Sequence, residues 1–231
     1  FRSRHRDLLD LAKRLAKRVP TGKRSSWFSA VNGQARPALR LFTREMEQTQ
    51  FALGIRTCSR HDPRRFALRL ANVILGENMS SRLFQSIREE HGLAYSIYST
   101  PNFYHDTGSL TIAAGLDTAH MQKALKLTLA ELRGLTEKPP GAAELRRARD
   151  YLIGQLELSL ESTESQMNWV GEQLLGFDQI IPPDEIKARL NEIRPSDIRR
   201  IARDFFRPEH LCLSLISPLK NDRALRKLLE I

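Results

Sequence analysis

The sequence lacks the short motifs that mark self-contained hydrolases and nucleotide enzymes. None of its six histidines begins H-E-x-x-H or H-x-x-E-H, the helical spacings that place two imidazoles on one face to bind zinc. It contains no G-x-S-x-G nucleophile turn and no G-x-x-x-x-G-K-[ST] phosphate loop. The chain by itself is therefore expected to hold no metal and to catalyse no hydrolysis.

Cysteine and long apolar runs are also scarce. Cys58 and Cys212 are the only cysteines, too few for a four-ligand zinc site or a disulfide framework. Both lie in strand-like runs, where buried free thiols are the default, and a single bridge between them stays open. No apolar run approaches the roughly 18 residues of a membrane-spanning helix. The chain starts at Phe1 without a signal-peptide pattern, so we expect a fragment. Its compartment stays open between the bacterial periplasm or cytoplasm and an organelle matrix.

Positive charge is present but unevenly distributed. The chain carries 37 basic and 27 acidic residues, yet residues 1–24 alone hold nine basic and two acidic side chains. The rest is close to neutral, which favours a solvated lead helix or linker. Nucleic-acid or anionic-membrane binding through this basic, amphipathic segment is the competing interpretation. It requires that a chain starting near Ala38 lose all such binding, and we expect neither partner.

The lead segment shows a helical pattern followed by a linker. Leu8, Leu11, Leu15 and Val19 recur at helical spacing, which predicts a helix over 5–18 that Pro20 ends. Residues 20–35 are rich in Gly, Ser and Lys and indicate a linker.

The body alternates short strand patterns with helices. Asp62-Pro63 predicts a helix start and Gly76 its stop, Ser80 is the expected N-cap of the next helix, and Gly92 ends that helix. Strands are predicted at 38–43, 49–57, 94–103, 108–116 and 210–217, and later helices at 119–135, 142–160, 164–176, 183–192 and 196–206. This order predicts an α+β fold, with one mostly antiparallel β-sheet packed against helices on a face.

The run Leu75–Ser99 resembles a known family. It reads L-G-x-x-x-S-S-R-L-F and then R-E-x-x-G-L-A-Y-S, and it is similar to the second-half signature of pitrilysin/insulinase-type zinc peptidases, the inverzincins that include mitochondrial processing peptidase. The resemblance covers about residues 38–217. It implies one half-domain of the processing-peptidase-like metallohydrolase fold, in which two similar halves close around a peptide and only the first carries H-x-x-E-H.

The resemblance also implies the domain organisation and the partners. Residues 1–35 would be the tail helix of a preceding domain plus the linker, 36–219 the inactive second-half domain, and 220–231 a C-terminal helix. The chain would be the substrate-cradling, non-zinc half of a zinc-dependent metalloendopeptidase that cleaves peptides or small unfolded proteins. Its partners would be a zinc-bearing half-domain or subunit and a peptide substrate, and the isolated fragment could also form a homodimer. Zinc would be the cofactor of the partner half.

Two residues are the candidate site. By resemblance, Arg88 donates to substrate backbone carbonyls and Tyr95 offers its hydroxyl to the oxyanion formed beside the partner half's zinc. Arg88 and Tyr95 are seven residues apart across a predicted helix, turn and strand, a separation that can place both side chains at the same end of the sheet. The competing interpretation makes Arg88 a solvated helix residue and Tyr95 a core aromatic. Glu89-Glu90-His91 is interpreted as solvated surface, and 167–169 as helix packing.

An alternative function stays open at this point. Family members that have lost the zinc motif serve as inactive structural or assembly subunits. The presence of both Arg88 and Tyr95 argues mildly against that role, because a structural half has no need of donors in a cleft.

Overall fold

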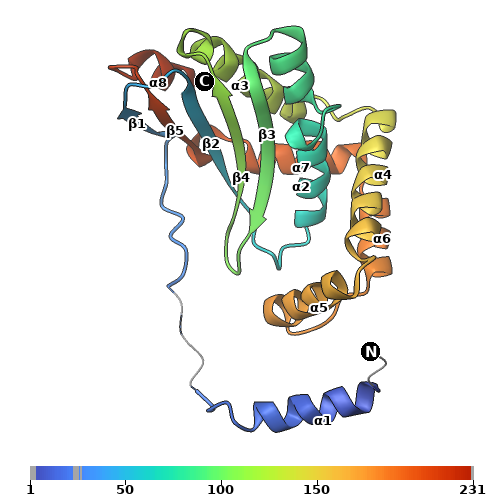
Figure 1. Cartoon of the computed structure of the whole chain (residues 1–231). Coiled ribbons are helices and arrows are strands. Elements are labelled where there is room, and N and C mark those ends of the chain that lie inside the picture. The colour runs from blue at the N-terminus through green and yellow to red at the C-terminus, as the bar shows by residue number, and fades with distance from the viewer. Residues whose placement is uncertain (1–3, 23–25, 27, 230–231) are drawn as a thin grey trace. The chain divides into compact units, whose positions relative to one another are not determined.

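The computed structural model describes residues 4–22, 26 and 28–229 (Figure 1). The chain divides into two compact units, Phe1–Val31 and Asn32–Ile231, which are described separately. The domain limits expected at residues 36 and 219 stay predictions. Within the described residues, no helix combines the length and the apolar character needed to cross a membrane.

The first unit contains one amphipathic helix, α1 (His5–Ala16). It is shorter than the predicted 5–18, because the chain turns at residues 17–19 ahead of Pro20. Val19 therefore lies beyond the helix. Leu8, Leu11 and Leu15 are each about half exposed and share one apolar face of the helix.

The second unit is built on a five-stranded sheet. Its strand order is β1-β5-β2-β4-β3, with β1 parallel to β5 and every other pair antiparallel (Figure 1). The strands are β1 (Ala38–Thr43), β2 (Thr49–Thr57), β3 (Ala94–Phe103), β4 (Gly108–Leu116) and β5 (Leu211–Ser217). The predicted α+β class and the mostly antiparallel sheet are confirmed, and β3 forms one edge.

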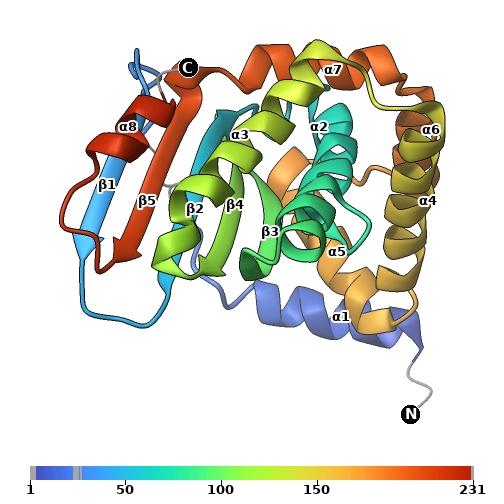
Figure 2. The same ribbon diagram turned by 90° about the horizontal axis from the view of Figure 1, so that it is seen from above.

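Helices supply the other side of the core. The α-helices are α2 (Arg65–Asn72), α3 (Met121–Glu137), α4 (Ala142–Ser159), α5 (Thr163–Phe177), α6 (Pro183–Glu192), α7 (Pro195–Phe205) and α8 (Arg223–Leu229). Short 3-10 turns, η3 (Thr118–His120) and η4 (Pro208–His210), precede α3 and β5. In Figure 2, α3 crosses in front of the strands while α4 and α6 stand together beyond α2, which contacts both.

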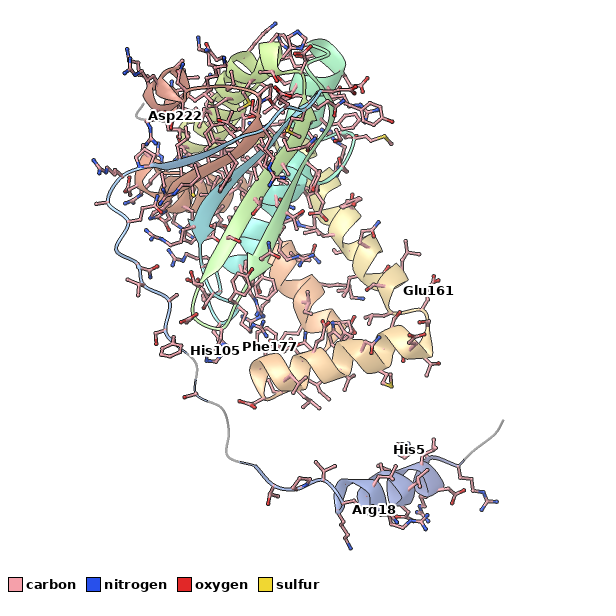
Figure 3. The ribbon with its side chains drawn as sticks, turned by 60° about the vertical axis from the view of Figure 1, so that its left-hand side comes forward. His5, Arg18, His105, Glu161, Phe177 and Asp222 are labelled. Atoms are coloured by element: carbon pink, nitrogen blue, oxygen red, sulfur yellow. The ribbon has the colours of Figure 1, made fainter. Side chains whose placement is uncertain are left out.

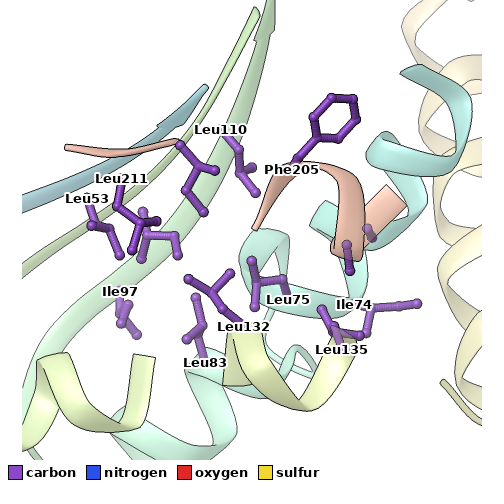
Figure 4. Packing of buried hydrophobic residues seen from close by; sticks show 14 of the residues in the cluster. Leu53, Ile74, Leu75, Leu83, Ile97, Leu110, Leu132, Leu135, Phe205 and Leu211 are labelled. Atoms are coloured by element: carbon purple, nitrogen blue, oxygen red, sulfur yellow. The ribbon is translucent and has the colours of Figure 1, made fainter. Parts of the chain in front are cut away.

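Alternate strand residues build the core. Leu53 of β2 and Leu110 of β4 are fully buried and meet Leu75, Leu83 and Leu132 from the helical layer (Figure 4). Apolar burial of this kind is the main favourable term in folding. The strand residues between them are small or polar and only partly covered, so the two faces of the sheet differ sharply.

The two cysteines are free. Cys212 pairs with Gly54, four residues from Cys58, and strand residues advance about 3.3 Å each. The thiols are therefore too far apart for a bridge, whose Cα atoms lie within about 7 Å. Burial raises the pKa of Cys58 to about 11, which makes it an unreactive thiol.

The signature segment departs from the predicted helix pattern in two ways. Both of its helices close in π-helical turns, η1 (Val73–Glu77) and η2 (Phe84–Glu90), a rare form that recurs at functional sites. The expected N-cap at Ser80 is wrong. Asn78 makes the turn instead, accepting from the Ser80 amide at 2.9 Å through Oδ1 and from the Ser81 hydroxyl at 2.5 Å through its carbonyl, since an Asn side chain competes well for turn amides.

Candidate functional site

Arg88 lies in the last turn of η2. Its side chain is 41% exposed, and its guanidinium carbon lies 4.7 Å above the Phe84 ring. The Nε atom is 3.7 Å from a carboxylate oxygen of Glu89, an exposed pair of small energetic value. The ring beneath orients the guanidinium while leaving its N–H groups accessible.

A left-handed glycine turns the chain from η2 into β3. Gly92 has φ +59°, a conformation that costs other residues steric strain. Its amide donates to the Arg88 carbonyl at 3.1 Å, and the Leu93 amide donates to the Ile87 carbonyl at 2.9 Å. These bonds satisfy helix-end carbonyls and fix where β3 begins relative to Arg88.

Tyr95 is the extra residue of a β-bulge. Ala94 pairs with Leu116 and Ser96 with Gly115, so Tyr95 has no partner on β4. An inserted residue reverses the alternation of faces after it, which keeps Ile97 in the core. Tyr95 is 82% exposed, and the interpretation of it as a core aromatic is wrong.

The bulge and the turn bring the two candidate residues together. The Arg88 guanidinium carbon lies 5.7 Å from the centroid of the Tyr95 ring, within cation–π range. The pair presents several N–H donors and one phenol hydroxyl to solvent at the start of the edge strand. Such an arrangement can donate to carbonyl or oxyanion groups of an extended chain.

A buried polar network holds the middle of β3 to the signature helices. Ser99 of β3 donates its hydroxyl to Asn72 Oδ1 at 2.6 Å, and Asn72 Nδ2 donates to Glu77 at 2.6 Å. Asn72 is fully buried. Gly76 makes the contact possible, because a Cβ there would lie 2.7 Å from Ser99 Oγ and 3.0 Å from its backbone nitrogen. Sequence reasoning missed Asn72 and Ser99. The signal available in the sequence was a polar residue at a position where the pattern of α2, and likewise that of β3, calls for a buried apolar one.

A second polar link ties the signature helix to α4. Arg82 Nε and Nη2 each donate to a Glu144 oxygen at 2.8 Å, a two-point contact suited to guanidinium geometry. Hydrogen bonding to Glu144 raises the pKa of Arg82. Burial is the largest single influence on Glu144 and opposes its ionisation, but the hydrogen bonds and charge of Arg82, a backbone hydrogen bond and the charge of Arg147 together lower the pKa of that carboxyl. Burial also raises the pKa of nearby Glu131.

Other residues singled out from the sequence take ordinary positions. Glu89, Glu90 and His91 are exposed, as expected of solvated surface. Among the described residues, no group of three or more His, Cys, Asp or Glu side chains could hold a metal ion. Met167 is 66% exposed, so the expectation of helix packing is wrong for it. Trp169 lines a cavity bounded in part by α5.

Solved structures define the class of fold. A protease from Helicobacter pylori superposes with a TM-score of 0.82 at 17% identity, over 94% of this chain and 53% of that one. A structure described as the peptidase M16 inactive domain from Pseudomonas fluorescens gives 0.81 at 20% identity, over 94% and 52%. At these identities the similarity shows the fold alone, which is that of about half of each of those chains.

The sequence comparisons give the family. Residues 3–152 match the family model described as the peptidase M16 inactive domain, and the chain belongs to that family. It is 38% identical to an uncharacterized zinc protease of Streptomyces coelicolor over 80% of this chain and 40% of the relative. It is 40% identical to the uncharacterized zinc protease YmxG of Bacillus subtilis over 77% and 43%. The chain thus spans less than half the length of these curated relatives. The resemblance recognised in Leu75–Ser99 is confirmed.

Proposed function

We propose that this chain is the substrate-cradling, non-zinc half of a zinc-dependent metalloendopeptidase, and that Arg88 and Tyr95 complete an active site whose metal is held by another half. The observation that carries the proposal is the exposed pair formed by Arg88 of η2 and Tyr95 at the start of the edge strand. The described residues of this chain offer no metal-holding group. The zinc named in the curated relatives would accordingly belong to the zinc-bearing half.

The position of Tyr95 supports a role in catalysis. A tyrosine side chain that is 82% exposed gains little from burial, so packing does not account for its place at the bulge. Its hydroxyl could donate to the scissile carbonyl oxygen as that atom gains negative charge. One preorganised donor of this kind is worth about 3 kcal/mol in the transition state.

The position of Arg88 supports a role in substrate binding. A peptide that pairs with β3 would extend the sheet by one strand, with the guanidinium at the start of that edge. Arg88 could then donate to two peptide carbonyls at once. On the face away from the core, Ser96 and Tyr98 stand opposite Gly115 and Ala113 of β4, and both are exposed, so their side chains could contact the added strand.

Reconstitution with a zinc-bearing half from the same source tests the proposal. The chain alone should show neither bound zinc nor peptide cleavage, and the mixture should cleave. Tyr95→Phe should lower kcat by about 100-fold with little change in KM, because it removes a hydrogen bond made mainly in the transition state. Arg88→Ala should act chiefly on KM.

A matched control distinguishes the effect at Tyr95 from the effect of removing any exposed tyrosine hydroxyl. Tyr104 lies beyond the far end of β3 and is 53% exposed, and Tyr104→Phe should cleave at the wild-type rate. Stable association without cleavage would instead favour a structural or assembly subunit. Turnover by the chain alone, after metal stripping and re-addition, would contradict the proposal.

A further inference from the structure

A concave region lies beyond the Phe103 end of β3. It is a cavity of about 790 Å³, within the size range of small-molecule sites. Its walls come from α2, α4, α5 and α6 and from Phe103, the last residue of β3. Figure 3 shows Phe177, at the end of α5, facing the hairpin tip at His105 beside this region. None of its residues takes part in the site at Arg88 and Tyr95.

Three arginines from one stretch of chain line this cavity. Arg60, Arg65 and Arg69 all contribute to its wall. Within the described part of the chain, none of them lies within ion-pair distance of a carboxylate. Burial is the first cause that lowers the pKa of Arg65, and the charges of Arg189 and then Arg69 act in the same direction. The cations therefore repel one another, and over the described ranges they lack a counter-ion.

Two buried polar atoms of the cavity lining also lack partners. Arg60 Nε and Gln173 Oε1 are buried and make no hydrogen bond to the described residues. An unsatisfied buried donor or acceptor costs about 1–3 kcal/mol, so native proteins seldom leave one without a ligand or water. Both residues line the cavity, and because the two atoms themselves are buried, a bound molecule would reach them after a rotation of either side chain.

Aromatic rings hold the guanidinium groups in place. The Arg65 guanidinium carbon lies 4.5 Å from the Phe177 ring centroid and 4.7 Å from that of Phe66, and Arg65 Nη1 donates to the Arg60 carbonyl. The Arg60 Nη2 atom donates to the Phe103 carbonyl at 3.2 Å. Trp169 adds a further ring to the lining. Stacked guanidinium groups of this kind keep donors free for an anion.

The acidic residues of the lining leave the arginine side uncompensated. Glu77 accepts a hydrogen bond from Asn72, which directs it to the signature network. Glu172 belongs to α5, and within the described residues it makes no ion pair with any of the three arginines. Arg189 is paired with Glu185 of its own helix. The cavity therefore offers a cationic wall, an aromatic surface and a volume suited to a small molecule.

We infer that this cavity binds a small organic anion, in which a phosphate or carboxylate head is joined to a flat apolar ring. The head would bond to Arg60, Arg65 and Arg69, and the ring would lie against the aromatic side chains. A guanidinium fork matches both kinds of oxyanion. The inference does not depend on the proposed peptidase role.

Titration of the full chain followed by tryptophan fluorescence tests the inference. The probes are AMP, phenyl phosphate, benzoate, inorganic phosphate and adenosine. Trp169 lines the cavity, so at least one aromatic anion should change its emission with a Kd below about 1 mM. Comparing phenyl phosphate with benzoate identifies the head group. Inorganic phosphate should bind at least about tenfold more weakly, and adenosine should not bind.

Matched variants locate the binding. Arg69 is exposed, so Arg69→Gln should fold normally and weaken binding about tenfold, the usual cost of losing a charge-assisted hydrogen bond. Arg146 is an exposed arginine of α4 outside the cavity, and Arg146→Gln should bind as the wild type does. Trp169→Phe should abolish the optical signal while calorimetry still detects binding.

Several results would overturn the inference. One is that no aromatic anion saturates, another that adenosine binds as tightly as AMP, and a third that Arg69→Gln and Arg65→Gln both bind normally. Tighter binding of a glutamate-rich peptide than of every small anion would also overturn the assignment to a small molecule. An unfolding midpoint measured for each variant distinguishes lost binding from lost folding.

Discussion

The two ends of β3 both gather arginine and aromatic side chains, but they treat positive charge differently. At the Ala94 end, Arg88 and Tyr95 are exposed and stack on each other. At the Phe103 end, Arg65 is enclosed between two rings with no carboxylate partner among the described residues. An exposed cation suits brief contact with a passing chain, whereas an enclosed one gains from a resident anion.

The two ends also differ in what holds them. The signature helices that lead into the Ala94 end are fixed to the middle of β3 by the Ser99–Asn72–Glu77 network and by a close contact with the Ser99 backbone. The Phe103 end is bounded by the flexible ends of arginine side chains. Steric changes should therefore be costly where the signature helices meet the middle of β3 and small at the Phe103 end.

Gly76→Ala should give the largest loss of stability. Its Cβ would lie 3.0 Å from the Ser99 backbone nitrogen, which cannot move without displacing β3. We expect the free energy of unfolding to fall by about 2–3 kcal/mol, as overpacking usually does. Denaturant unfolding measures it, with Gly171→Ala as the control.

Gly171 lies inside α5, and no atom lies within 4 Å of the position that a Cβ would take there. Alanine at this position should stabilise the helix by up to about 1 kcal/mol. A Gly76→Ala protein as stable as the wild type would show that the signature end is not held rigidly.

Arg82→Met should give the next largest effect. It keeps the length of the side chain but leaves Glu144, which is 26% exposed, without its two hydrogen bonds. We expect a loss of about 2 kcal/mol at pH 7. The lowered pKa of Glu144 means that this pair stabilises the fold above the usual carboxyl pKa and ceases to do so as pH falls through the lowered value. The variant should thus approach wild-type stability in acid, and a constant difference at all pH values would contradict the assignment.

The regular elements could be predicted from the sequence, whereas their junctions could not. Residues that alternate between apolar and small or polar predicted both ends of β2 (49–57) and β4 (108–116) correctly, because one face of each strand is buried. The bulge at Tyr95 was not predicted. Its signal is that Ala94 and Ile97 are three residues apart, whereas two residues on the same face of a regular strand are an even number apart. The π-helical turns have no local composition signal, since tertiary packing selects them.

Of the two candidate sites, the sequence predicted only the first. Arg88 and Tyr95 are seven residues apart and belong to one contiguous signature, which identified both residues. The cavity combines residues from Arg60 to Leu190, which only the packing of α2 against α4 and α6 brings together. A single sequence carries no signal for contacts at that separation.

Glu131→Gln tests the electrostatics near the signature end with a smaller effect. Burial raises the pKa of Glu131 above its usual 4.5, so the folded state holds the proton more tightly than the unfolded state does. The wild-type stability therefore declines as pH rises through the raised pKa. Glutamine removes that loss, and we expect a gain of less than about 1 kcal/mol at pH 7 that vanishes below the usual carboxyl pKa. Unfolding curves across this range measure it, and a destabilised variant at pH 7 would be the contrary result.

Gly176→Ala should change stability least and separates the two ends of β3 most sharply. A Cβ at this position would lie 2.5 Å from Arg60 Nη1, the free end of a side chain that can swing aside. Alanine gains up to about 1 kcal/mol as a helix former, and the displaced Arg60 loses its bond to the Phe103 carbonyl, so the two effects should nearly cancel. Binding of aromatic anions should still weaken several-fold, because Arg60 no longer faces the cavity in the same way. A loss of stability as large as that of Gly76→Ala would show that both ends are equally rigid.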